Sequence, residues 1–407
     1  MTPAILLAGG EPFGPAQIPL SMLVVFVAAK LLAELFERMG QPGIVGQILA
    51  GILIGPHVLG WLEPNVVLAV LAELGVMFLL FRVGLDVKSS ELLQVGGTAM
   101  LVACAGVVVP FFLGWGIGAW WGEARIEAIF MAAAMVATSV GITAQVLRAK
   151  GFLHARASRI ILAAAVIDDV LGLLVLAVVT SLAKGAVNIL QLFLTAAIAL
   201  GFTVLVAKWG TRTMHRLVPR VEARMSIVES QFALSMALLF GLALLAVYAG
   251  VAAVVGAFLA GMTLSETVDR RVCQLTDGVT ELLVPFFLAG IGLHFDVTVF
   301  SSGSTMLLAL AVFVAAVVSK LTGCGLGAAA LGRRDALRVG VGMIPRGEVG
   351  MVVAQLGLAM GVMGRSVYGV VVFMAVATTL VAPPLLKWAY REVAPEPSAE
   401  PEALRLG

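Results

Sequence analysis

Long apolar segments follow one another along almost the whole of this 407-residue chain, and they decide what it can fold into. A helix needs about 20 mostly apolar residues to span a bilayer. Segments of this kind lie at 17–38, 43–60, 66–85, 92–121, 126–149, 157–181, 189–210, 227–247, 250–265, 279–293, 305–330, 336–360 and 364–390. Charged residues make up only 12% of the chain, against about 25% in soluble domains, so lipid must surround most of the fold. The sequence therefore predicts an all-α polytopic membrane protein with about 13 transmembrane helices.

The connections between these segments alternate in charge. Lys and Arg gather at every second connection, whereas the remaining connections hold only Arg125, Lys184 and Arg365. Positively charged loops mark the cytoplasmic side of a membrane protein. We therefore expect an external N-terminus, a transmembrane unit at residues 1–391 and a short disordered cytoplasmic tail at residues 392–407. The net charge of +2 gives no indication of a nucleic-acid partner.

Two stretches in the first half of the chain resemble two stretches in the second half. Residues 45–51 (VGQILAG) match residues 255–261 (VGAFLAG), and residues 73–85 match residues 281–293 in their Glu-Leu and Gly-Leu positions. The two members of each pair lie seven predicted spans apart, so they cross the membrane in opposite directions. Inverted repeats of this kind are typical of secondary transporters.

Corresponding positions of the two halves also interrupt an apolar segment. Residues 137–141 (ATSVG) place small polar residues and Gly inside span 126–149, and residues 342–348 (GMIPRGE) interrupt span 336–360. Pro345 cannot donate a backbone hydrogen bond, and its ring clashes with the preceding helical turn. Because unwound helices at matching positions form the substrate site of many transporters, we expect two discontinuous helices here.

Ionisable side chains inside the predicted spans are the candidates for a transport site. Asp168 and Asp169 lie near the middle of span 157–181, and Lys320 lies in the otherwise apolar span 305–330. A charge at this depth costs about 2.5–3.5 kcal/mol on the insertion scale and usually has a function. Neighbouring residues of an α-helix point about 100° apart. One aspartate can therefore pair with Lys320 while the other faces a wet cavity.

A carboxylate in a partly dehydrated site can hold a proton or a hard cation, because both bind the same oxygen atoms. Competition at a site that opens alternately to the two sides of the membrane is sufficient for antiport. A buried ion pair that only joins helices is the structural alternative, and it leaves the second carboxylate unexplained. Arg346 and Glu348 lie at the Pro345 break, where they can compensate the dipole ends of the half-helices or pair with each other.

Three rival functions explain these residues less well. A potassium-channel filter motif such as TVGYG is absent, although lining residues alone do not exclude a channel. An intramembrane aspartyl protease needs carboxylates from different helices, whereas Asp168 and Asp169 are adjacent, and neither HExxH nor GxSxG occurs. We therefore do not expect an enzyme. A sodium-coupled symporter for an organic anion shares the architecture, but a proton-exchanging site explains the aspartates and Lys320 better.

Three motifs carry a family resemblance: residues 138–143 (TSVGIT), 166–172 (VIDDVLG) and 345–348 (PRGE). They resemble the monovalent cation:proton antiporter-2 family, especially its bacterial sodium/proton antiporters with an aspartate pair. The resemblance extends from Gln41 to the last predicted span. It implies a core domain that contains the fifth, sixth, eleventh and twelfth spans, in which the discontinuous fifth and twelfth spans cross. It also implies a separate dimerisation domain, a homodimer and elevator-like movement of the core.

The resemblance also implies roles for individual residues. Asp169 would be the main carrier of Na+, or Li+, and of protons, while Asp168 would pair with Lys320 in one state and Thr138 and Ser139 would lie near the ion. Family members with these residues resemble electrogenic exchangers that move more protons than cations. We therefore expect a Na+/H+ antiporter of a bacterial inner membrane that needs no cofactor. A K+/H+ antiporter of the same family is the alternative.

Overall fold

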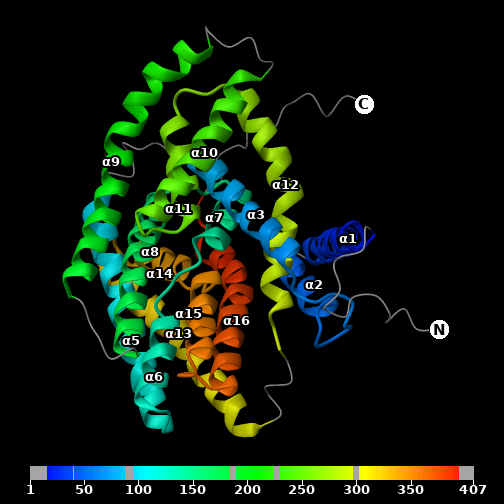
Figure 1. Cartoon of the computed structure of the whole chain (residues 1–407), viewed down its shortest axis with the longest axis vertical. Helices are drawn as coiled ribbons and strands as arrows, with labels where there is room; N and C mark the ends of the chain where they lie inside the picture. Colours follow the sequence, from blue (N-terminus) through cyan, green and yellow to red (C-terminus); the bar gives the residue numbers. More distant parts are fainter. Residues whose placement is uncertain are drawn as a thin grey trace.

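The computed structural model describes residues 16–39, 41–87, 95–183, 189–222, 229–296 and 302–393. Over these ranges the regular secondary structure is entirely helical, as the apolar segments predict (Figure 1). The expected external N-terminus and the predicted disordered tail beyond Val393 lie outside the described residues, and so does Lys184.

The helices account for the predicted spans one by one. Their bounds are α1 (Gln17–Arg38), α2 (Gly43–Ile54), α3 (Val66–Leu85), α5 (Gly96–Trp121), α6 (Arg125–Ala134), α7 (Val140–Ala149), α8 (Arg156–Ala183), α9 (Ile189–Glu222), α10 (Ser230–Tyr248), α11 (Ala253–Leu264), α12 (Arg270–Leu293), α13 (Gly303–Gly327), the 3-10 turn η2 (Ala329–Leu331), α14 (Arg333–Gly342), α15 (Glu348–Ala359) and α16 (Arg365–Ala389). Each predicted span coincides with one helix, or with two helices where we predict a break. Among the described residues, 8 helices are long and apolar enough to cross a membrane, so this is an integral membrane protein. The number of crossings stays a prediction.

Three predicted boundaries are wrong by more than one helical turn. The helix expected over 43–60 ends at Ile54, because Gly55 is extended and the following Pro56 disfavours a helical conformation before it. The helix expected over 189–210 continues to Glu222, and the one expected over 279–293 begins at Arg270. Hydropathy marks only the apolar part of a helix, whereas polar residues can continue the same helix into the aqueous phase.

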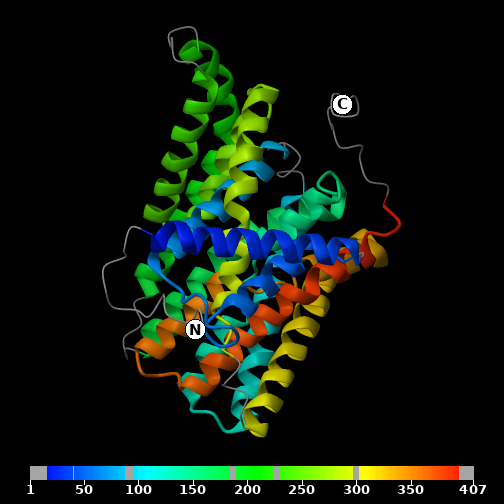
Figure 2. The same ribbon diagram turned by 90° about the vertical axis from the view of Figure 1, so that its right-hand side faces the viewer.

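The helices pack as two groups. One group, the frame, contains α1, α2, α3, α10, α11 and α12, in which α3 packs on α11 and α12 and α2 packs on α1 and α12. The other group, the core, contains α5–α8 and α13–α16, in which α5 packs on α6, α8 and α13. The long helix α9 contacts α8 of the core and α11 of the frame. Figures 1 and 2 show α9 along one edge of the molecule and α1 lying across the opposite face.

Matching glycines of the two predicted repeats make matching contacts within the frame. A Cβ atom at Gly51 of α2 would overlap the carbonyl oxygen of Ala289 on α12, and one at Gly261 of α11 would overlap that of Phe81 on α3. Glycine therefore lets these backbones touch. Two further pairs of equivalent contacts follow the same pattern. A Cβ atom at Gly46 would overlap the backbone of Leu32, as one at Gly256 would overlap that of Leu242. Likewise, a Cβ atom at Gly84 would overlap the backbone of Phe258, as one at Gly292 would overlap that of Ile48. Such equivalence is the pattern expected of two repeats that pack on each other.

Candidate ion-binding site

The two helix breaks lie against each other, between the core helices. The backbone N–H of Ser139, the N-cap residue of α7, donates to the carbonyl oxygen of Pro345 over 2.8 Å. The hydroxyl of Thr143, one turn into α7, donates to the carbonyl oxygen of Gly342 at the end of α14 over 2.7 Å. These bonds satisfy backbone groups that lack a helical partner at the breaks. The discontinuous helices predicted at residues 137–141 and 342–348 are therefore present, and they are joined.

Arg346 is fully buried at this junction. Its Nη1 atom donates to the carbonyl oxygens of Val136 and Ala137 over 2.8 and 3.1 Å, and its Nη2 atom donates to the carbonyl of Ala316 on α13 over 3.3 Å. The first two carbonyls follow the C-terminal end of α6, where the helix dipole is negative. This is the arrangement that charge compensation by Arg346 requires. The side chain of Glu348, at the start of α15, lies outside the described part of the structure.

Two threonines of α16 hold the unwound segment in place, and sequence reasoning missed them. The Thr378 hydroxyl accepts from the backbone N–H of Arg346 over 3.1 Å, and the Thr379 hydroxyl donates to the carbonyl oxygen of the same residue over 2.8 Å. Both threonines are fully buried. Adjacent hydroxyls inside an apolar span were a signal in the sequence, although threonines in helices usually bond only to their own backbone.

Lys320 of α13 and Asp168 of α8 form a buried pair. The Lys320 Nζ atom lies 3.1 Å from Oδ1 and 3.4 Å from Oδ2 of Asp168, and the two side chains are 0% and 1% exposed. The neighbouring α5 leaves room for the ammonium group at Gly106, because a Cβ atom there would lie 3.2 Å from Nζ and 2.7 Å from the Sγ atom of Cys324. The ion pair thus links α13 to α8, and α5 packs beside it at Gly106.

Asp169 points to a different neighbourhood, as adjacent residues of a helix must. Its side chain is 8% exposed and lines a cavity of about 10 Å³, close to the space that one water molecule needs. The other lining residues come from both helix groups: Val140, Leu162 and Val166 from the core, and Leu80, Val255 and Phe258 from the frame. Asp169 therefore lies where the core meets the frame, and the other residues that line this cavity are apolar.

Thr138 and Ser139 are both buried in the break between α6 and α7. The Thr138 hydroxyl has no hydrogen-bond partner among the described residues, although it is shielded from solvent. A buried hydroxyl without a partner costs free energy unless something else binds it. Hard cations bind such oxygen atoms and carboxylates. Within the described ranges no three His, Cys, Asp or Glu residues cluster as a metal site.

Comparisons with known proteins identify the family of this chain. Residues 22–392 match the family model described as sodium/hydrogen exchanger, transmembrane. The chain is 32% identical to the Na+/H+-K+ antiporter GerN of Bacillus cereus over 375 residues, and this match covers 90% of this chain and 95% of the relative. It is 34% identical over 440 residues to the high-affinity Na+/H+ antiporter NhaS3 of Synechocystis sp., with 95% and 93% covered. The chain therefore belongs to the sodium/hydrogen exchanger family, whose members are transporters and not enzymes.

The fold has a solved counterpart. The sodium proton antiporter MjNhaP1 from Methanocaldococcus jannaschii superposes with a TM-score of 0.72 and covers 93% of this chain and 97% of its own. The sequence identity is 16%, so this likeness supports the fold alone. The family-level prediction and the all-helical architecture are thereby confirmed, whereas the roles of individual site residues stay predictions.

Proposed function

We propose that this protein exchanges Na+, and also Li+, for protons, and that Asp169 carries both. The observation that supports this proposal best is the position of Asp169. It lies beside the buried Lys320–Asp168 pair, next to two helix breaks, in a small cavity between core and frame. A carboxylate in a partly dehydrated site holds a proton more readily than one in water, and a cation can displace that proton. Thr138 would supply a further oxygen ligand, because its hydroxyl lacks a protein partner in the described structure.

The Lys320–Asp168 pair gives the exchange a second proton-binding group. An ammonium group that is fully desolvated depends on its carboxylate partner to stay charged. When a cation draws the carboxylates towards itself, Lys320 loses that partner and releases a proton. Binding of one cation would then displace a proton from each of two groups, which would make the exchange electrogenic. The lysine takes its proton back when the cation leaves.

The division into core and frame supports an elevator-like movement. Asp169 and Val140 are carried by core helices, whereas the cavity is closed by Leu80 and Phe258 of the frame. Sliding of the core along this apolar wall would expose Asp169 first to one side of the membrane and then to the other. This part of the frame can remain dry because Leu80, Val255 and Phe258 carry no polar side chain.

The outer face of the frame suits a homodimer. On this face Lys30 of α1 lies 2.7 Å from Glu281 of α12, and the two side chains are 38% and 76% exposed. Glu73, halfway along α3, is exposed as well. Charges at membrane depth are costly against lipid, so a second copy of the chain would shield them better. Size-exclusion chromatography with light scattering in mild detergent tests this oligomeric state.

Purified protein in liposomes tests the exchange itself. An imposed proton gradient is challenged with Na+, Li+ and K+ in turn, and internal pH is read from a fluorescent dye. We expect Na+ and Li+ to collapse the gradient in the wild-type protein, with no response in Asp169→Asn. Flux that needs no counter-ion would indicate a channel, and exchange that requires an organic anion would indicate a symporter.

Potassium is the second candidate cation. The relative GerN is named a Na+/H+-K+ antiporter, and it is 32% identical to this chain. The K+ arm of the liposome assay decides between the two. Collapse of the gradient by K+ at concentrations at which Na+ has no effect would replace the sodium proposal with K+/H+ exchange through the same aspartate.

A further inference from the structure

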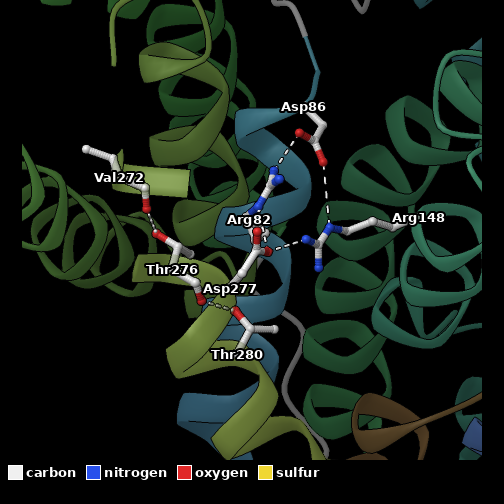
Figure 3. A network of polar contacts seen from close by, with 7 residues as sticks. All are labelled: Arg82, Asp86, Arg148, Val272, Thr276, Asp277 and Thr280. Carbon is white, nitrogen blue, oxygen red and sulfur yellow. Dashed lines mark hydrogen bonds and ion pairs between the residues drawn. The ribbon is translucent and has the colours of Figure 1, made fainter. Parts of the chain in front are cut away.

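Four charged side chains join α7 of the core to α3 and α12 of the frame (Figure 3). Arg148, in the last turn of α7, pairs through Nη2 with Oδ1 of Asp277 on α12, and its Nε atom lies 3.6 Å from Oδ2 of Asp86 at the end of α3. Arg82 of α3 binds the same two carboxylates, with Nη1 2.5 Å from Asp86 and Nε 2.9 Å from Asp277. Each aspartate of this four-charge cluster thus contacts both arginines.

The cluster is built more firmly than a surface ion pair. Its side chains are between 12% and 38% exposed, and Arg82 is the least exposed of the four. The neighbouring Thr276 and Thr280 donate to carbonyl oxygens of α12 itself, so they do not compete for the Asp277 carboxylate. Networks of this kind hold a geometry better than isolated exposed pairs do.

Only one of the four residues belongs to the core. Arg82, Asp86 and Asp277 lie on frame helices or at their ends, whereas Arg148 lies on α7. At its other end, α7 begins at Val140, which follows the N-cap residue Ser139 and lines the Asp169 cavity. A helix of 10 residues is about 15 Å long and rigid. The contacts of Arg148 therefore hold the same short rod that forms one wall of the ion site.

We propose that Arg148 is a positioning residue for cation exchange. Its ion pairs with Asp86 and Asp277 clamp α7 to the frame and keep the Asp169 cavity closed towards the arginine-rich end of the helices, which is the predicted cytoplasmic end. They break when the core moves and the cavity opens there. This inference rests on the proposed movement of core against frame, and it adds the contact that sets which side of the membrane the site faces.

Site-directed labelling tests the proposal independently of transport. Val140→Cys is placed in a protein whose native cysteines, Cys104, Cys273 and Cys324, are replaced by alanine. A membrane-impermeant thiol reagent is then added to oriented vesicles from either side. Adding Arg148→Gln should raise the labelling rate from the arginine-rich side roughly tenfold and lower it from the opposite side, as a shift between two states requires. Arg148→Lys, which retains the charge, should restore part of the difference.

A matched control comes from the same end of the molecule. Arg271 of α12 pairs with Glu229 at the start of α10 over 2.8 Å, and both helices belong to the frame. Arg271→Gln should therefore leave both labelling rates unchanged. Equal rates with and without Arg148→Gln would overturn the proposal. A rise from both sides together would also overturn it, because that result indicates loosened packing and not a change of facing.

Transport kinetics provide the second measurement, and they decide the question if the cysteine proves unreactive. In liposomes, Arg148→Gln should lower the KM for Na+ on the arginine-rich side and raise it on the opposite side, each by roughly 3- to 10-fold. An unchanged ratio of the two KM values would refute the role of Arg148. Complete lack of exchange in the wild-type protein would instead refute the proposed function, and the labelling result would still report on the clamp.

Discussion

The buried pair of Lys320 and Asp168 predicts a strongly non-additive double-mutant cycle. Removing one partner leaves an uncompensated charge or a desolvated carboxylate in a site where the two side chains are 0% and 1% exposed. Breaking a buried pair from one side typically costs about 3–5 kcal/mol. We expect a loss of this size for Asp168→Asn and for Lys320→Met. The methionine retains most of the length that packs against Gly106.

The double variant should be more stable than the sum of the two losses predicts. It contains no orphaned charge, so the coupling between the substitutions should be at the upper end of the roughly 0.5–3 kcal/mol found for residues in contact. The exposed pair of Arg271 and Glu229 is the control, because its side chains are 58% and 35% exposed and such pairs contribute about 0–1 kcal/mol.

The assay is the apparent Tm in detergent, followed by intrinsic fluorescence at one scan rate, since membrane proteins commonly unfold irreversibly. All four proteins of the cycle are compared in the same detergent and buffer. Additive decreases in Tm would refute the pairing and would require another explanation for a lysine inside the core. Non-additive decreases in Tm, together with a loss of the voltage dependence of exchange in the double variant, would support Lys320 as the second proton-binding group.

Three further results are expected from single substitutions. Asp169→Asn should abolish proton-coupled Na+ flux in liposomes while the protein still elutes as a monodisperse peak, and preserved coupled flux would exclude Asp169 as the carrier. Thr138→Val should raise the KM for Na+ several-fold with little change in Tm, because the hydroxyl has no hydrogen-bond partner among the described residues to lose; an unchanged KM would remove it from the site. Arg346→Met should lower the Tm markedly, since the carbonyl oxygens of Val136 and Ala137 would lose their donor at roughly 1–3 kcal/mol per buried group, and an unaltered Tm would contradict that capping role.

The parts of the site that follow from local chemistry could be predicted from the sequence. Pro345 removes a backbone donor and lies between Gly342 and Gly347, so the break in its span was predictable. The apolar flank of Lys320 allowed few ways to stabilise its charge. The contacts of Arg346 were harder to predict from the sequence. Its Nη atoms donate to main-chain carbonyl oxygens, such as that of Ala316, whose positions depend on the packing of distant helices. No pattern of side chains in the sequence indicates the positions of these carbonyl oxygens.

Charges near helix ends were the weakest part of the sequence interpretation. Arg82 and Arg148 served only as markers of the positive side, and Asp277 gave no signal, because a charged residue near a helix end is usually solvated. Lys30, which lies within the first predicted span, contacts Glu281 on another helix. Pairings across about 130 to 250 residues of chain depend on tertiary arrangement. Periodicity and composition do not contain that information.

The glycine contacts of the frame have a consequence for leakage. Gly51 and Gly261 bring α2 against α12 and α11 against α3 with main chain touching main chain. Seams of this kind contain no side chains that could change rotamer and open a transient path, and separating them by even 1 Å would forfeit much of the dispersion attraction along the whole contact. An exchanger dissipates the gradient it uses whenever an ion slips past without its counter-ion. With the proposed movement of core against frame, fixed seams within the frame would confine such passage to the boundary beside Asp169, where occupancy of the carboxylate would control it.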